Sequence, residues 1–140
     1  MTDDCIFCKI IEGSIPAVTV YEDDKVIAFM DIMPINPGHV LAVPKAHFRE
    51  LNEMDEETGA HLFRVGMRID RALRRSGLRV EGTNLLQNNG RAAFQEVPHV
   101  HLHIIPRYEG DGMKVRFGQE KAAPEQLREW AGLIKSKMER

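Results

Sequence analysis

The sequence predicts an α+β domain with a mostly antiparallel sheet, and two observations support that prediction. The chain has 140 residues, of which 43% are hydrophobic and 29% are charged, which suits a single domain over residues 1–140 with a sizeable core. Segments typical of strands and helices follow in the order strand, strand, strand, helix, strand, strand, helix. Because the strands come in consecutive runs, the pattern favours an α+β class over a parallel sheet with alternating helices.

The first predicted elements are a hairpin and a third strand. Residues 18–22 and 26–30 are rich in β-branched and aromatic residues and flank an acidic turn at 23–24. Residues 33–38 contain two prolines and a glycine, which cannot sit within a sheet ladder, so they are expected to form a loop. The apolar run at 39–43 then resumes as a strand.

The central helix is expected over residues 56–76. Asp55 is a suitable N-cap, and Gly77 can end the helix in the left-handed conformation. Between them the apolar positions keep helical spacing on one stripe, namely Leu62, Val65, Ile69, Ala72 and Leu73.

Two further strands and a last helix complete the expected fold. Residues 83–87 have the pattern of a strand that runs into a turn at 88–90, and residues 97–106 are predicted to be the last core strand. Pro124 suits the first position of a final helix, and its apolar stripe consists of Leu127, Trp130, Ile134 and Met138.

The last core strand contains half of the six histidines, at every second position: His99, His101 and His103. Because side chains alternate across a strand, three imidazoles would share one face and apolar residues the other. Two chemistries use such a face. The imidazoles could bind zinc and activate water, or one neutral imidazole could attack an electrophile while its neighbours bind or protonate other groups.

Composition narrows the compartment and the partners. The formal net charge of −2 gives no sign of a nucleic-acid or membrane-surface partner, and no apolar run is long enough for a membrane span. The first residues lack the pattern of a signal peptide, so a cytoplasmic location is expected. The two cysteines, Cys5 and Cys8, form a Cys-x-x-Cys pair. In the cytoplasm such a pair is more often a metal site or a pair of reactive thiols than a disulfide.

The chain resembles the histidine-triad (HIT) superfamily. Residues 99–105 match its signature, His-φ-His-φ-His-φ-φ with φ apolar. Residues 5–11, 29–32 and 37–41, and the loop from Asn88 to Gln95, resemble further family segments in the same order. The resemblance implies a HIT-like fold with a five-stranded, mostly antiparallel sheet, a central helix and a C-terminal helix, pairing into a two-fold dimer. The core would span about 5–108, and an extension with its helix about 109–140.

The resemblance also implies roles for the histidines. His101 would attack the α-phosphorus of a nucleoside phosphoramidate or dinucleoside polyphosphate, and water would then release a nucleoside monophosphate from the nucleotidyl-histidine. The carbonyl of His99 would orient the His101 ring, His103 would contact the phosphate, and His39 would complete the catalytic cluster.

A purine nucleotide is the implied substrate, and the resemblance assigns the residues that would bind it. Asp31 and Ile32 belong to the ribose-contacting segment, and Asn88 would hydrogen-bond ribose or phosphate. The loop with Phe94, Gln95 and Glu96 would present backbone N–H groups to the phosphate oxygens. Glu96 departs from the family pattern, because many relatives have a serine there that contacts the phosphate or the leaving group.

The resemblance further implies a structural zinc site formed by Cys5, Cys8, His47 and His99, and no catalytic metal. Two other functions remain open from the sequence. The protein could be a nucleotide-binding regulator with incidental slow hydrolysis, or a zinc-dependent hydrolase that uses the triad itself as ligands.

Overall fold

The computed structural model describes residues 4–115 and 117–139, so residues 1–3, 116 and 140 of the predicted 1–140 domain lie outside it. In chain order the elements are α1 (Ile6–Glu12), β1 (Thr19–Glu22), β2 (Val26–Met30), β3 (Val40–Pro44), the short 3₁₀ helix η1 (Leu51–Glu53), α2 (Glu56–Arg75), β4 (Gly82–Gln87), η2 (Arg91–Ala93), β5 (Leu102–Arg107) and α3 (Pro124–Lys135). Each predicted strand and helix is present, and the bounds agree within a few residues except at the start of the last strand, which was expected at residue 97 and begins at Leu102. The predicted α+β class is confirmed.

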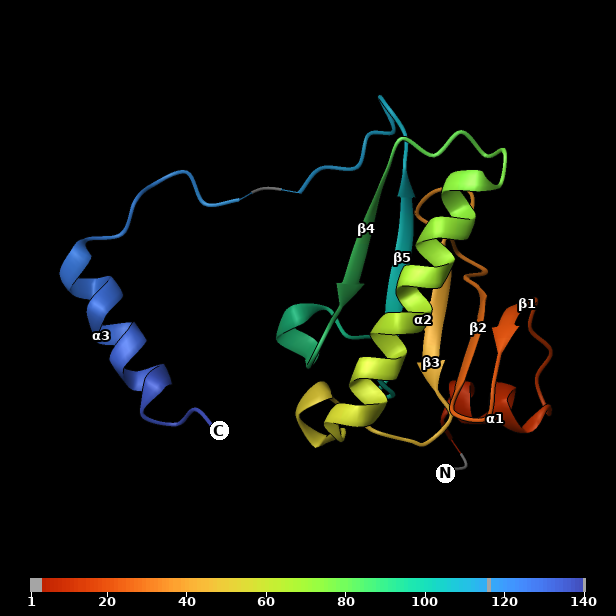
Figure 1. The fold of residues 1–140 in the computed structure, drawn as a ribbon, viewed down its shortest axis with the longest axis horizontal. Coiled ribbons are helices and arrows are strands. Elements are labelled where there is room, and N and C mark those ends of the chain that lie inside the picture. Colours follow the sequence, from red (N-terminus) through yellow and green to blue (C-terminus); the bar gives the residue numbers. More distant parts are fainter. Residues whose placement is uncertain (1–3, 116, 140) are drawn as a thin grey trace.

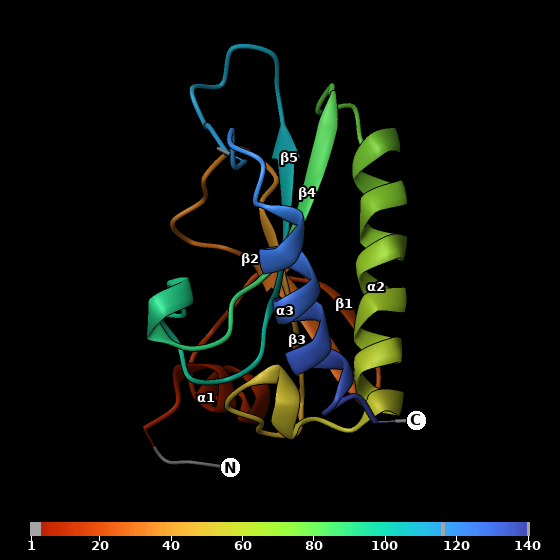
Figure 2. The same ribbon diagram turned by 90° about the vertical axis from the view of Figure 1, so that its left-hand side faces the viewer.

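The five strands form one antiparallel sheet in the order β1-β2-β3-β5-β4. Figure 1 shows α2 lying along one face of this sheet, and Figure 2 shows that α1 and η2 lie on the opposite side. Strand β4 is an open edge, since only β5 pairs with it. The central position of β3 and β5 places the histidine segment in the middle of the domain.

Alternation along the strands divides the core into two layers. Towards α2, one set of small and branched residues packs on the helix stripe: Val26, Ala28, Val40, Ala42, Val100, Leu102, Ile104, Leu62, Val65, Ile69 and Leu73. The other face packs against α1, with Ile27, Phe29, Leu41, Val43, Phe7 and both cysteines. The predicted separation of histidines from the apolar face is therefore confirmed, because residues 100, 102 and 104 all face α2.

The histidine segment differs from the prediction in one respect. Strand β5 begins only at Leu102, so His99 and His101 precede the ladder. The Val100 N–H instead donates to the carbonyl of Phe48 (2.8 Å), which holds this stretch extended beside the loop after β3. Leaving the ladder frees the His99 carbonyl for a side chain.

Helix α1 was missed by the sequence reasoning. Its seven residues are too few to show a helical period, and its N-cap is Cys5, whose sulfur accepts a hydrogen bond from the Cys8 N–H at 3.4 Å. Gly13, at a φ of 88°, ends the helix in the left-handed region. Tertiary contacts of Phe7 and the cysteines hold this short helix on the sheet.

Helix α3 stands away from the sheet at the end of an extended arm (Figure 1). Its predicted start at Pro124 is confirmed, and Met138 of the predicted stripe lies beyond the helix end. The apolar side chains of the stripe are exposed, with Trp130 48% accessible. None of the described helices is both long and apolar enough to cross a membrane.

Candidate active site

His101 is held so that one ring nitrogen is committed and the other is available. The residue is buried, and its Nδ1 lies 2.7 Å from the carbonyl oxygen of His99. A carbonyl only accepts, so Nδ1 carries the proton and Nε2 carries a lone pair. Burial lowers the pKa of the His101 imidazole, which keeps the ring neutral near pH 7. A neutral, aimed imidazole of this kind can act as a nucleophile.

His39 and His103 form a second pair with defined tautomers. The backbone N–H of Ile35 donates to Nδ1 of His39 at 3.1 Å, so a neutral His39 carries its proton on Nε2. That Nε2 lies 2.9 Å from Nδ1 of His103, which must accept. The proton of a neutral His103 is thereby placed on its Nε2.

Burial favours the neutral state of both rings. It lowers the pKa of His39 and lowers the pKa of His103 to about 4, and the neighbouring His101 adds to the effect. The rings of His101 and His103 lie 4.9 Å apart between centroids. One lone pair and one N–H donor are thus fixed side by side in the described structure.

Asp31 lies next to this pair. Its Oδ1 accepts the Met33 N–H at 2.8 Å, and its Oδ2 lies 3.5 Å from Nε2 of His39. The carboxylate is half-buried, and the adjacent Ile32 is 88% exposed. The loop at 31–38 therefore places an acceptor and an exposed apolar side chain at the edge of the histidine pair.

The loop after β4 contains the remaining predicted nucleotide-binding residues. Asn88 is half-buried at the end of β4, and Phe94 is 84% exposed with a φ of 67°, an uncommon conformation for a residue other than glycine. The Gln95 N–H already donates to the carbonyl of Gly90, so it is not free for a ligand. Among the described residues, the backbone N–H groups of Glu96 and Val97 have no protein acceptor.

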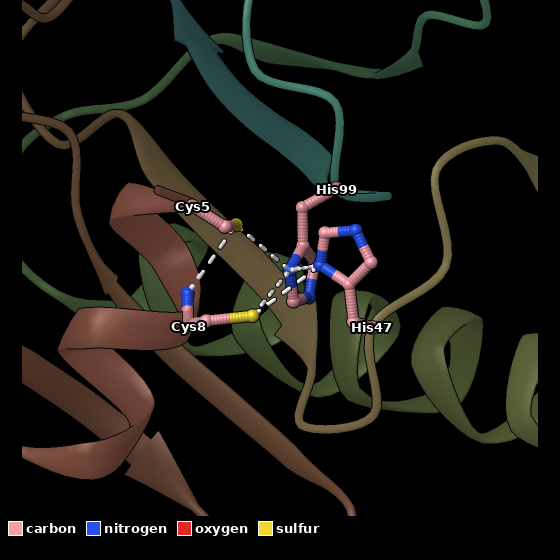
Figure 3. A group of neighbouring side chains, drawn as sticks. All are labelled: Cys5, Cys8, His47 and His99. Carbon is pink, nitrogen blue, oxygen red and sulfur yellow. Dashed lines mark hydrogen bonds between the residues drawn. The ribbon is translucent and has the colours of Figure 1, made fainter. Parts of the chain in front are cut away.

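The predicted metal ligands also come together, although they come from three distant segments (Figure 3). Cys5 and Cys8 lie at the start of α1, His47 follows β3, and His99 precedes β5. The Cys5 sulfur is 3.4 Å and the Cys8 sulfur 3.6 Å from Nδ1 of His99. Nδ1 of His47 is 3.3 Å from the Cys8 sulfur and 3.0 Å from Nδ1 of His99.

These four ligand atoms fit a tetrahedral zinc ion. Zinc–nitrogen and zinc–sulfur bonds of roughly 2.0 and 2.3 Å at tetrahedral angles separate ligand atoms by about 3.3–3.8 Å. Nε2 of His99 lies 2.8 Å from the carbonyl of Pro44, so it donates there and Nδ1 presents its lone pair to the cluster. A lone pair 3.0 Å from a second ring nitrogen is stabilised by a cation or proton between them. The cluster can therefore hold a metal.

His99 and Phe7 connect the two clusters. The side chain of His99 belongs to the cysteine cluster, while its carbonyl orients His101. The Phe7 ring packs edge-on against both imidazoles, with centroid distances of 5.9 Å to His99 and 5.0 Å to His101. The sequence reasoning missed Phe7, since an apolar residue in a Cys-x-x-Cys pair gives no signal of contact with a distant histidine.

Comparison with known proteins agrees with this geometry. The family model described as HIT domain matches residues 12–110. The adenosine 5′-monophosphoramidase of Schizosaccharomyces pombe is 38% identical over 135 residues, which cover 96% of this chain and 98% of that protein.

Solved structures extend the similarity to the whole fold. A HIT family member from Bacillus subtilis is 40% identical, with a TM-score of 0.90 and coverage of 99% of both chains. A zinc-bound HIT family protein from Mycobacterium smegmatis is also 40% identical, with a TM-score of 0.77 and coverage of 96% of this chain and 98% of that chain. The family model, the sequence identity and the shared fold agree, and the chain belongs to the HIT family.

Proposed function

We propose that the protein is a nucleotide hydrolase that cleaves the bond at the α-phosphorus of a nucleoside phosphoramidate or dinucleoside polyphosphate. The observation that carries this proposal is the orientation of His101, whose Nδ1–H is held by the His99 carbonyl while Nε2 keeps its lone pair. The similarity of this chain to an adenosine 5′-monophosphoramidase supports the same chemistry and a purine nucleotide as substrate.

The proposed reaction has two steps at one imidazole. Nε2 of His101 forms a bond to the α-phosphorus as the leaving group departs with the electron pair of the broken bond. Water then attacks the nucleotidyl-histidine, and the imidazole leaves as the nucleoside monophosphate forms. As positive charge develops on His101, the hydrogen bond to the His99 carbonyl stabilises it.

The surrounding groups bind and polarise the phosphate. His103 would donate from Nε2 to a phosphoryl oxygen, because the chain of hydrogen bonds from Ile35 through His39 fixes its proton there. The free N–H of Glu96 offers a further donor.

The nucleoside would lie against the loop at 31–38. Asp31 would accept from the ribose hydroxyls, and Ile32 and Phe94 offer exposed apolar surface to the base. Asn88 remains a predicted contact of ribose or phosphate, whereas the N–H and the side-chain amide of Gln95 are bonded within the loop, so Gln95 would support the phosphate site indirectly.

Zinc is proposed as a structural cofactor. Cys5, Cys8, His47 and His99 would hold it through four protein ligands, and it would supply rigidity to the segment that orients His101. Similarity to a zinc-bound relative supports this assignment. The alternative of a triad that binds a catalytic zinc is not favoured, because Nδ1 of His99 lies within 3.6 Å of both cysteine sulfurs and its Nε2 lies 2.8 Å from the carbonyl of Pro44, which leaves neither ring nitrogen to join His101 and His103.

We also propose a cytoplasmic homodimer. The open edge at β4 and the exposed apolar residues Phe63, Met67 and Leu86 on α2 and β4 provide a surface that a second copy would cover. Light scattering at micromolar concentration should give twice the chain mass of 15.9 kDa, and a monomer mass would refute the dimer.

His101→Ala tests the proposed reaction. The variant should lose turnover of adenosine phosphoramidates while nucleotide affinity stays within about tenfold, or roughly 1.4 kcal/mol. Rapidly quenched wild-type protein should show a nucleotidyl adduct on His101 by mass spectrometry. Turnover that persists in His101→Ala would refute the mechanism, and tight binding without turnover in the wild type would favour the regulatory alternative.

A further inference from the structure

A cavity of about 590 Å³ lies beside the loop that leads into the histidine segment. Four charged side chains line it: Arg49 and Glu50 from the segment after β3, Arg91 from η2, and Glu96 from the loop. Its formal charge is zero, with two cations and two anions.

The cavity wall is fixed by one glutamine. Oε1 of Gln95 accepts the Gly90 N–H at 2.7 Å, and Nε2 donates to the carbonyls of Arg49 (2.7 Å) and Val97 (3.0 Å). The backbone on both sides of Glu96 is therefore tied to the segment with Arg49 and to the turn before η2. The hydrogen bonds of the Gln95 side chain therefore link the backbone segments that carry the four charged groups.

The charged side chains of this cavity do not form ion pairs with one another. Within residues 4–115 and 117–139, no ion pair joins any two of Arg49, Glu50, Arg91 and Glu96. Charged groups that line a cavity without mutual ion pairs remain available to a ligand, and walls of both signs complement a ligand that also has both signs.

Glu96 is the charged residue of this cavity that is nearest to the nucleophile along the chain. Only two residues separate it from His99, whose carbonyl orients His101. Pro98, which directly precedes His99, also lines the cavity. Arg49 and Arg91 come from the segment after β3 and from η2, so Glu96 is the charged group on the part of the wall that leads into the histidine segment.

We propose that this cavity is a leaving-group subsite for an amine with a distal anionic group, either carboxylate or phosphate. The inference rests on the proposed function, which puts the substrate phosphorus at His101. The nitrogen bound to phosphorus lies towards Glu96, and the anion lies between Arg49 and Arg91. Glu96 then replaces the neutral hydroxyl that many relatives have with a charge that selects the leaving group.

The chemistry of the departing group explains the selection. When the phosphorus–nitrogen bond breaks, its electron pair stays on nitrogen. The nitrogen already carries one hydrogen, so one proton from solvent gives the neutral amine, and a second proton from solvent gives the ammonium ion. The Glu96 carboxylate stabilises that positive charge. A polyphosphate leaving group would instead bring negative charge beside the carboxylate, so the subsite disfavours dinucleoside polyphosphates.

The test is a substrate panel that varies only the leaving group. Adenosine phosphoramidates of propylamine, diaminopropane, β-alanine and aminoethyl phosphate, together with diadenosine tetraphosphate, are compared by kcat/KM. The variants are Glu96→Gln, Arg49→Gln and Arg91→Gln, and thermal unfolding verifies that each is folded. Glu57→Gln and Arg74→Gln are matched controls, because both residues are exposed on α2 and make no side-chain hydrogen bond or ion pair among the described residues.

The wild type should prefer the two amines with a distal anion over propylamine by about five- to tenfold, the range expected for a charge-assisted contact. Either arginine variant should abolish that ratio. Glu96→Gln should reduce the ratio of phosphoramidate to tetraphosphate kcat/KM by about tenfold. The β-alanine and aminoethyl phosphate arms distinguish a carboxylate from a phosphate ligand.

Ratios in the three cavity variants that match the wild type and the α2 controls would overturn the subsite while leaving the proposed function intact. A wild-type preference for diaminopropane or tetraphosphate would also overturn it. If the wild type turned over no member of the panel, the proposed function itself would fail, and the subsite with it.

Discussion

Replacing His39 by alanine should impair catalysis indirectly, because His39 determines which ring nitrogen of His103 carries the proton. His39 is buried, accepts the Ile35 N–H and places its own Nε2 at 2.9 Å from Nδ1 of His103. Without it, the proton of His103 can move to Nδ1 and leave Nε2 without a hydrogen to donate. Loss of one preorganised donor to a reacting oxyanion costs about 2.7–4 kcal/mol, so kcat should fall by roughly 100- to 1000-fold.

His39→Ala should also destabilise the fold, since it removes two partly buried hydrogen bonds and leaves the Ile35 N–H and Nδ1 of His103 without their partner. The expected loss is about 2–4 kcal/mol of unfolding free energy, measured by urea unfolding. His39→Gln is the matched control, because an amide offers one acceptor for Ile35 and one donor for His103. Its kcat on an adenosine phosphoramidate should exceed that of the alanine variant at least about tenfold.

Two results would refute this reasoning. One is a kcat for His39→Ala within threefold of the wild type. The other is a His39→Gln variant that recovers stability and yet has the kcat of the alanine variant, because the hydrogen-bond chain would then have no role in the chemistry.

Three further perturbations test other parts of the structure. Burial lowers the pKa of His103 from its ordinary value of 6.5 to about 4, so unfolding takes up a proton between pH 4 and pH 6.5. The unfolding free energy measured in urea should therefore hold above pH 6.5 and decline as the pH falls towards 4. An increase over that range would contradict the burial of the ring. Gly38→Ala should lower the unfolding free energy by about 1–3 kcal/mol, since its φ is 93° and a Cβ would lie 3.0 Å from Leu78; unchanged stability in urea would mean that the loop relaxes without cost. The double variant Cys5→Ser with Cys8→Ser should lose about one zinc per chain by metal analysis and some thermal stability while keeping measurable turnover; full metal content would rule out these ligands.

Much of the fold follows from local patterns in the sequence. Asp55 caps α2 by accepting the Thr58 N–H at 3.0 Å, and Gly77 has a φ of 87°, as a left-handed helix end requires. The alternation of histidines with apolar residues predicts which side chains face α2, even where the backbone leaves the ladder. These features depend on neighbours within a few residues, so a single sequence contains them.

Other features of the fold could not be predicted from the sequence, because they depend on contacts between residues that are far apart in the chain. Helix α1 is one short element whose position depends on packing against the sheet. His61 gave no signal of a role, yet it lies 2.7 Å from Asp23 and links α2 to the turn between β1 and β2. Each feature depends on a partner that is distant in the chain.

The sequence alone determined the class of the domain, the histidine face, the cysteine pair and the family that these motifs resemble. The resemblance already implied two roles for His99, and only the tertiary structure supplies their geometry, with its Nδ1 3.4 Å from the Cys5 sulfur and its carbonyl oxygen 2.7 Å from Nδ1 of His101. The tertiary structure also decided the tautomers, which depend on the Ile35 N–H and on the carbonyls of His99 and Pro44. Periodicity fixes the face on which a side chain lies, whereas the atom it meets there is set by segments that only the folded chain brings together.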